Sequence, residues 1–221
     1  MLLAKEDVAD LAPLVRRAAS LDRSSVVRLR RTSEQISALV RLPFGVLAAR
    51  TIVLDQRSAV GVEDVAVRCS DLLAWLDGEY ADPPEQRNAE WRSGLPPTSG
   101  WQRVDTVPEA VVRQLVRAGA LALQEAAARE GVPGAQPRAE VADALLDSVV
   151  LTVTDGARSV EVTLRSLSAV TRLGFLPQGS SIAIDVAGRW VRVAAGYGSV
   201  YSERPGSGLV LTRADHGSKR G

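Results

Sequence analysis

Short runs of alternating apolar and polar residues constrain this chain most strongly. Residues 149–154 (VVLTVT) and 159–164 (SVEVTL) alternate in this way and are separated by the four residues DGAR. Alternation places every second side chain on one face of a strand, and a short link that contains Gly is typical of a β-hairpin. The apolar face of such a hairpin must be buried against another element. The sequence therefore predicts an α+β fold built on antiparallel sheets that helices cover.

The N-terminal part shows the same pattern after a first helix, LAPLVRRAAS. Three strand-like runs, 25–31, 36–42 and 46–54, are separated by short breaks, which predicts an antiparallel meander. A further strand, VEDVAVRC, then leads into a short helix between Ser70 and Gly78. A polar residue at the start and Gly at the end are typical helix boundaries.

The C-terminal part is predicted to have the element order α-β-β-α-β-β. A short helix, AEVADALLD, precedes the first hairpin, and a helix from Ser166 to Gly174 precedes a second hairpin formed by IAIDV and RWVRVAA. The glycine-containing stretch GYGSVY (196–201) is assigned to turns. This element order resembles that of bacterial secretion chaperones, and the resemblance implies a protein that binds partner chains on a sheet or helix face.

The two parts contain similar passages. VAVRCSDLLAWLDG (65–78) and VEVTLRSLSAVTRLG (160–174) each begin as a strand and continue as a helix between Ser and Gly. Duplication of one unit would explain this, but any strand followed by a short helix would show the same signals. Both explanations stay open, and in either case two antiparallel units are expected.

Glycine and proline mark the predicted domain boundary at GVPGAQP (131–137). The first domain, 1–131, would include a long Pro- and Trp-containing loop at 78–105 and a helix at 106–130 with a capping box of Thr106 and Glu109. The second domain would span 138–204. Residues 205–221 lack periodicity and are expected to form a frayed tail.

Composition argues against most enzyme classes. The chain has one His, His216 in the expected tail, so triads and zinc sites that need histidines are not available. We find no phosphate-binding glycine motif and expect no catalytic residues, cofactor or metal. One Cys, Cys69, fits a reducing compartment and is interpreted as a packing residue. Arg supplies nearly all of the positive charge, which is typical of a GC-rich bacterial genome.

A net charge of +1 and the lack of a long uncharged apolar stretch favour a cytoplasmic protein without a membrane segment. The preferred hypothesis is a non-enzymatic binding or adaptor protein that recognises another protein chain. Large aromatic side chains near Gly and Pro are the candidate contacts, although burial within the chain is the commoner explanation for such residues. These residues are Trp91, Trp101, Trp190 and Tyr197.

The sequence leaves two alternative functions open. A nucleic-acid-binding protein would use an arginine-rich sheet face made of Arg28, Arg30, Arg41 and Arg50, although solvated arginines are the commoner explanation. An enzyme would use carboxylates for acid and base chemistry in a cleft between the two units. A homo-oligomer also stays open.

Overall fold

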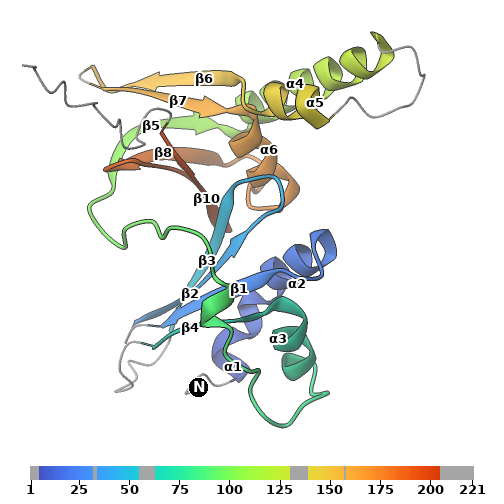
Figure 1. The fold of residues 1–221 in the computed structure, drawn as a ribbon. Coiled ribbons are helices and arrows are strands. Elements are labelled where there is room, and N and C mark those ends of the chain that lie inside the picture. The colour runs from blue at the N-terminus through green and yellow to red at the C-terminus, as the bar shows by residue number, and fades with distance from the viewer. Residues whose placement is uncertain (1–4, 32–33, 55–62, 130–138, 157, 205–221) are drawn as a thin grey trace, which may run out of the picture.

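The computed structural model describes residues 5–31, 34–54, 63–129, 139–156 and 158–204. These residues contain both helices and antiparallel sheets, which confirms the predicted α+β class. The described strands form one sheet of eight and a second sheet of two (Figure 1). Of the helices in these ranges, none has the length and hydropathy that a membrane span requires.

The N-terminal half confirms the predicted helix, the meander and the additional strand. Strands β1, β2 and β3 pair antiparallel in sequence order, and β4 pairs on the far side of β1. Pro13 lies in the first turn of α2, where a missing backbone donor costs no helical hydrogen bond. The elements are α1 (Lys5–Val8), η1 (Ala9–Leu11), α2 (Ala12–Leu21), β1 (Val26–Arg31), β2 (Gln35–Arg41), β3 (Leu47–Val53), β4 (Glu63–Arg68) and α3 (Cys69–Leu76).

The C-terminal half confirms both predicted hairpins, β6 with β7 and β8 with β9. From α5 to β9 the predicted order α-β-β-α-β-β is also correct. The elements are η2 (Asn88–Glu90), β5 (Gln102–Pro108), α4 (Glu109–Arg129), α5 (Ala139–Leu146), β6 (Val149–Thr154), β7 (Ser159–Thr163), α6 (Leu164–Arg172), β8 (Ser181–Ala187), β9 (Trp190–Ala195) and β10 (Gly198–Glu203).

Two local predictions are wrong. The long helix was expected from Thr106, but Thr106 lies in β5 opposite Ala183, and the helix begins at Glu109. The stretch 196–201, assigned to turns, ends in strand β10. Gly198 is required there by close packing, because a Cβ would lie 2.7 Å from the Phe175 ring and 2.8 Å from the Ala49 carbonyl oxygen. A local turn signal and a tertiary close approach both favour Gly, and the sequence does not distinguish them.

Strand β10 joins the two halves into one sheet. The strand order is β4-β1-β2-β3-β10-β9-β8-β5, and β3 meets β10 through the pairs Ala49 with Ser199 and Leu47 with Tyr201. The two predicted units are therefore continuous through this junction. Strand β5 was not predicted; its residues, which the prediction places in the loop and helix of the first domain, pair with β8 of the second half. The predicted boundary at 131–137 lies outside the described residues, so the division into 1–131 and 138–204 stays a prediction.

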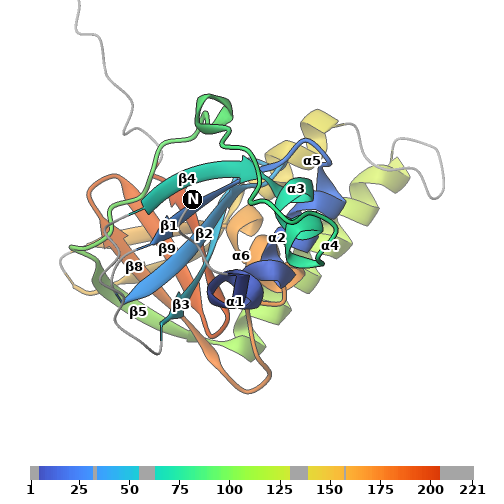
Figure 2. The ribbon, with the colours of Figure 1, turned by 90° about the horizontal axis from the view of Figure 1, so that it is seen from below.

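The main core lies between the large sheet and the helices, which gather on one side of it (Figure 2). Aliphatic side chains such as Leu29 of β1, Ile184 of β8 and Leu167 of α6 are fully buried there. Helix α4 packs closely on α6, because a Cβ on Gly119 would lie only 2.4 Å from a methyl group of Leu164. We call this side of the sheet the helix-covered face.

Candidate functional site

The opposite side of the large sheet is crossed by the segment 79–101 between α3 and β5, and we call it the loop-covered face (Figure 1). Directly paired residues on antiparallel strands point to the same side. One row of pairs therefore places a set of polar and aromatic side chains together on this face. The row is Arg41, Leu47, Tyr201, Arg192, Asp185 and Arg103, taken in order from β2 to β5.

A small second core holds the loop on this face. Its buried members are Leu39, Leu47, Ala49 and Trp190, and the partly buried side chains packed against them are Trp91, Leu95, Trp101 and Tyr201. The indole N–H of Trp91 donates to the Ser93 carbonyl at 2.7 Å, and that of Trp101 donates to the Pro97 carbonyl at 2.9 Å. The indole donors are thus satisfied within the loop, which leaves the rings free to pack on the strands.

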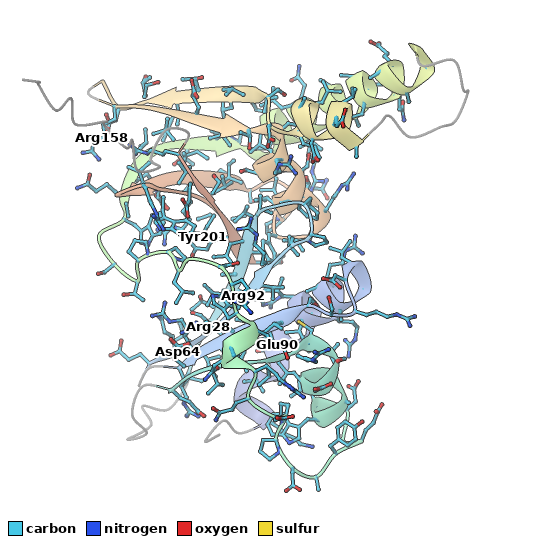
Figure 3. All side chains as sticks on the ribbon, in the orientation of Figure 1. Arg28, Asp64, Glu90, Arg92, Arg158 and Tyr201 are labelled. Atoms are coloured by element: carbon cyan, nitrogen blue, oxygen red, sulfur yellow. The ribbon has the colours of Figure 1, made fainter. Side chains whose placement is uncertain are left out.

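Ion pairs compensate much of the positive charge on this face. Arg28 donates to both oxygens of Asp64, at 2.7 and 3.0 Å, and these hydrogen bonds raise the pKa of Arg28 (Figure 3). The carboxylate of Asp185 is 2% exposed and accepts hydrogen bonds from Arg103 at 3.1 Å and Arg192 at 3.0 Å. Removal of either arginine would leave this buried carboxylate with less compensation of its charge, which is costly in a buried site.

The structure brings three of the four predicted aromatic residues together. Trp91, Trp101 and Trp190 share the second core, whereas Tyr197 lies at the turn between β9 and β10 and is 55% exposed. The sequence analysis did not select Tyr201. The centre of its ring lies 5.6 Å from that of Trp101, and burial raises its pKa. Only the assignment of 198–203 to a strand would have placed Tyr201 on the same face as Arg192.

The four predicted arginines do not form one face, which corrects the arginine-rich face expected from the sequence. Arg28 and Arg30 lie on the loop-covered face, and Arg41 lies at its edge. Arg50 pairs with Ala38, which is buried in the main core, so Arg50 points to the helix-covered side. The alternation of side chains along β1 was predicted correctly. Which residues of neighbouring strands share a face depends on the register between the strands, and alternation within one strand does not give that register.

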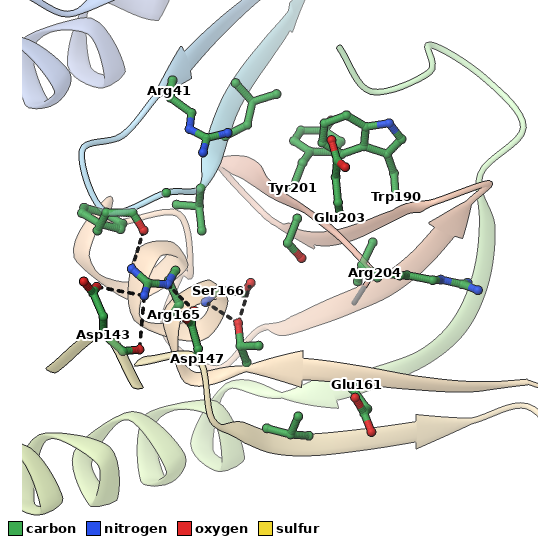
Figure 4. Close-up of a pocket in the computed structure, with 18 of the residues that line it drawn as sticks. Arg41, Asp143, Asp147, Glu161, Arg165, Ser166, Trp190, Tyr201, Glu203 and Arg204 are labelled. Carbon is green, nitrogen blue, oxygen red and sulfur yellow. Dashed lines mark hydrogen bonds and ion pairs between the residues drawn. The ribbon is translucent and has the colours of Figure 1, made fainter. Parts of the chain in front are cut away.

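Two hollows flank the second core, and Tyr201 lines both. The first has a volume of about 830 Å³ and lies among the β2–β3 turn, α5, β7 and the ends of β9 and β10 (Figure 4). Arg165 links two sides of this hollow. It donates to the Phe44 carbonyl at 2.6 Å and forms ion pairs with Asp143 at 3.0 Å and Asp147 at 2.7 Å. We call this cavity the Arg165 hollow.

The second hollow, which we call the Trp101 hollow, has a volume of about 590 Å³. Its floor is formed by side chains of β2, β3 and β10, and one wall is the loop segment Pro96–Thr98 with Trp101. The guanidinium carbon of Arg192 lies 4.5 Å from the centre of the Trp101 ring, in a cation–π arrangement. This places an arginine and an aromatic ring side by side at the rim.

The described residues offer little for catalysis. Cys69 is fully buried, and desolvation raises its pKa to about 11, so the thiol is neutral and poorly nucleophilic at neutral pH. In the described ranges, no three His, Cys, Asp or Glu side chains gather as a metal site requires. Arg165 forms ion pairs with both aspartates of the Arg165 hollow, Asp143 and Asp147. The geometry of both hollows suits binding.

Comparison with solved structures shows a sliding-clamp-like fold. The DNA polymerase III subunit beta from Pseudomonas aeruginosa matches with a TM-score of 0.56 at 15% identity, over 95% of this chain and 67% of that one. A beta sliding clamp from C. crescentus, with PEG bound to a putative beta-motif tethering region, gives 0.52 at 12% identity, over 92% and 64%. The DnaN sliding clamp from Bartonella birtlesii bound to griselimycin gives 0.53 at 10% identity, over 92% and 64%. This chain thus spans about two thirds of the clamps.

Comparison with curated proteins gives no match. Two family models match the sequence, one described as Domain of unknown function (DUF8010) over residues 1–93 and the other as Domain of unknown function (DUF8185) over residues 96–207. The two models meet between η2 and β5, within the segment that crosses the loop-covered face. The second model matches just over half of the chain, and the protein therefore belongs to the family Domain of unknown function (DUF8185).

Proposed function

We propose that this protein is a non-enzymatic scaffold that binds another protein chain on its loop-covered face. The observation that carries the proposal is the pair of hollows on either side of one partly buried aromatic cluster. Binding sites for protein chains typically combine aromatic anchors with arginines and a polar rim. Trp101, Tyr201 and Arg192 provide that combination where the two halves of the sheet meet.

The fold supports the same function. One matched sliding clamp is bound to griselimycin, and another has PEG bound to a putative beta-motif tethering region. A similar scaffold in this protein would recognise its partner by shape and polarity. Fold similarity alone is compatible with many functions, so the proposal rests on the geometry of the face.

Nucleic-acid binding is the second candidate, because the matched structures are DNA polymerase clamps. The arginines named for it from sequence lie on two faces, and Asp64 pairs with two of them. We therefore rank it below protein binding. Homo-oligomerisation is a further proposal, and the molar mass in solution, measured by light scattering, tests it.

Site-specific photo-crosslinking tests the proposed function. The full chain carries p-benzoylphenylalanine at Thr51, an exposed position in the Trp101 hollow, or at Arg172, an exposed position on α6. We expect a defined protein to crosslink through position 51 and not through position 172. Loss of that crosslink on Tyr201→Ser would link it to the aromatic cluster. Equal crosslinking from both positions, or crosslinks to nucleic acid alone, would refute the proposal.

A further inference from the structure

The Trp101 hollow has one sign of charge. Its described lining contains Arg30, Arg31 and Arg192 and no Asp or Glu. The Arg165 hollow differs, because its lining includes Asp143, Asp147, Glu161 and Glu203 beside its arginines. Complementary charge steers a partner to a site and suppresses wrong partners. Asp64 is shared by Arg28 and Arg30, and Asp185 by Arg103 and Arg192, so each carboxylate compensates one of its two arginines and net positive charge remains beside the hollow. This charge favours a ligand that carries negative charge.

The floor of this hollow suits an extended chain. Ser37, Ala49 and Ser199 are small residues on three neighbouring strands, and Thr51 is paired with Ser37. The hydroxyl groups of Ser37 and Thr51 lie 2.7 Å apart and share a hydrogen bond. Small side chains allow a backbone to approach the sheet, and hydroxyl groups can both donate to and accept from its peptide groups.

Strand spacing sets the length of the ligand. Arg30 lies on β1 and Arg192 on β9, with β2, β3 and β10 between them. Four spacings of about 4.8 Å across the sheet, together with a register offset of four residues or about 13 Å along the strands, place the two backbones roughly 23 Å apart. An extended peptide covers that span in about seven residues at roughly 3.3 Å per residue, and fewer are needed because the arginine side chains reach inward. Two carboxylates separated by about four to seven residues could therefore meet both arginines.

The aromatic residues favour a peptide over a nucleic acid. Single-stranded nucleic acids bind by stacking bases on the faces of exposed aromatic rings. The ring of Trp101 has Arg192 above it at 4.5 Å and Tyr201 beside it at 5.6 Å. Those contacts limit access to the ring for a base, whereas the ring edge and Leu39 still offer apolar contact to a small aliphatic side chain.

We propose that the Trp101 hollow binds an acidic, aliphatic peptide segment in extended form, with carboxylates that pair with Arg30 and Arg192. The proposal rests on the protein-binding function proposed above and identifies the chemistry of the partner. The carboxylates would join guanidinium groups that already have one acidic neighbour each, Asp64 for Arg30 and Asp185 for Arg192. Each Arg retains further N–H donors, since a guanidinium group carries five.

Selection from a display library of random ten-residue peptides on the immobilised full chain tests this proposal. We expect Asp and Glu to be enriched about threefold over the starting library and to recur about four to seven residues apart. Thr51→Glu, which adds a negative charge on the floor, should abolish the enrichment. The matched control Thr51→Gln has a side chain of the same size as Glu without the charge. It should weaken the enrichment much less than Thr51→Glu, because it adds bulk to the floor but no charge repulsion.

Arg30→Gln provides a second variant, because Arg30 lies on the partly exposed side of β1 and its loss leaves Asp64 paired with Arg28. We expect a selected acidic peptide to bind about tenfold more weakly to this variant. Neutral or basic binders, binders insensitive to Thr51→Glu, an absence of binders, or displacement of the peptide by oligodeoxythymidylate would each overturn the proposal. If one of these results is found while a protein still crosslinks at position 51, the peptide proposal fails and the proposed function is retained.

Discussion

The two faces of the large sheet are built by different means. The helix-covered face buries aliphatic side chains completely, and the helices that cover it satisfy their own backbone hydrogen bonds. The loop-covered face lies under an irregular segment whose polar backbone groups need other partners or water. Its contacts are therefore made by aromatic rings, arginines and acidic residues such as Asp64, Asp185 and Glu90, with hollows between them. If the proposed function holds, the helix-covered face supplies most of the stability and the loop-covered face binds the partner.

The largest expected effect concerns the helix-covered face. Leu167 is fully buried in α6, and Leu167→Ala removes apolar contacts and leaves a cavity. We expect the free energy of unfolding to fall by about 3 kcal/mol, measured by urea denaturation. Thr51→Ala on the exposed floor of the Trp101 hollow is the control and should change it by less than about 0.5 kcal/mol. Similar losses from both variants would contradict the division of roles between the faces.

An intermediate effect is expected for the buried carboxylate of the loop-covered face. Asp185→Asn keeps the size of the side chain but removes the charge that Arg103 and Arg192 share. We expect a loss of about 2 kcal/mol in the free energy of unfolding, since hydrogen bonds to charged groups are strong and the arginines lose their common partner. An unchanged urea midpoint would show that the ion pairs of this face contribute no stability.

The smallest effect concerns the pH dependence of stability through Cys69. Burial raises the pKa of this thiol from 9.0 to about 11, so the unfolded chain releases the proton at lower pH than the folded chain. The contribution of Cys69 is fully present below the unfolded pKa and is lost as pH rises toward 11. At about pH 10 the loss is about 1 kcal/mol.

Denaturation of the wild type and of Cys69→Ala at about pH 7 and about pH 10 measures the contribution of Cys69 to the free energy of unfolding, because the other titrating groups are common to both proteins. The wild type should lose more stability than the variant between the two pH values. Equal losses would mean that water reaches the thiol, and the helix-covered face would then be less tightly packed than the burial of Cys69 indicates.

The candidate site was predictable in part. Trp91, Trp101 and Trp190 were selected because large aromatic residues near glycine and proline often form contacts, and they do share one cluster. Tyr201 and Arg192 were not among the selected residues, because their role depends on a neighbour across the sheet. Tyr197 and Tyr201 are equally conspicuous in the sequence, yet the register of β10 with β9 places only Tyr201 beside Arg192.

Sequence by itself determined the hairpins, most of the helix positions and the strands other than β5 and β10, because alternation, turn residues and helix boundaries are local properties of the chain. Only the tertiary structure decided that β3 and β10 join the two halves, that Arg50 faces away from Arg28, and that the loop forms one wall of the Trp101 hollow. Those features depend on contacts between residues far apart in the chain. Close packing of Gly198 against Phe175 and Ala49 has no local signature, so it appears only once the sheet is assembled.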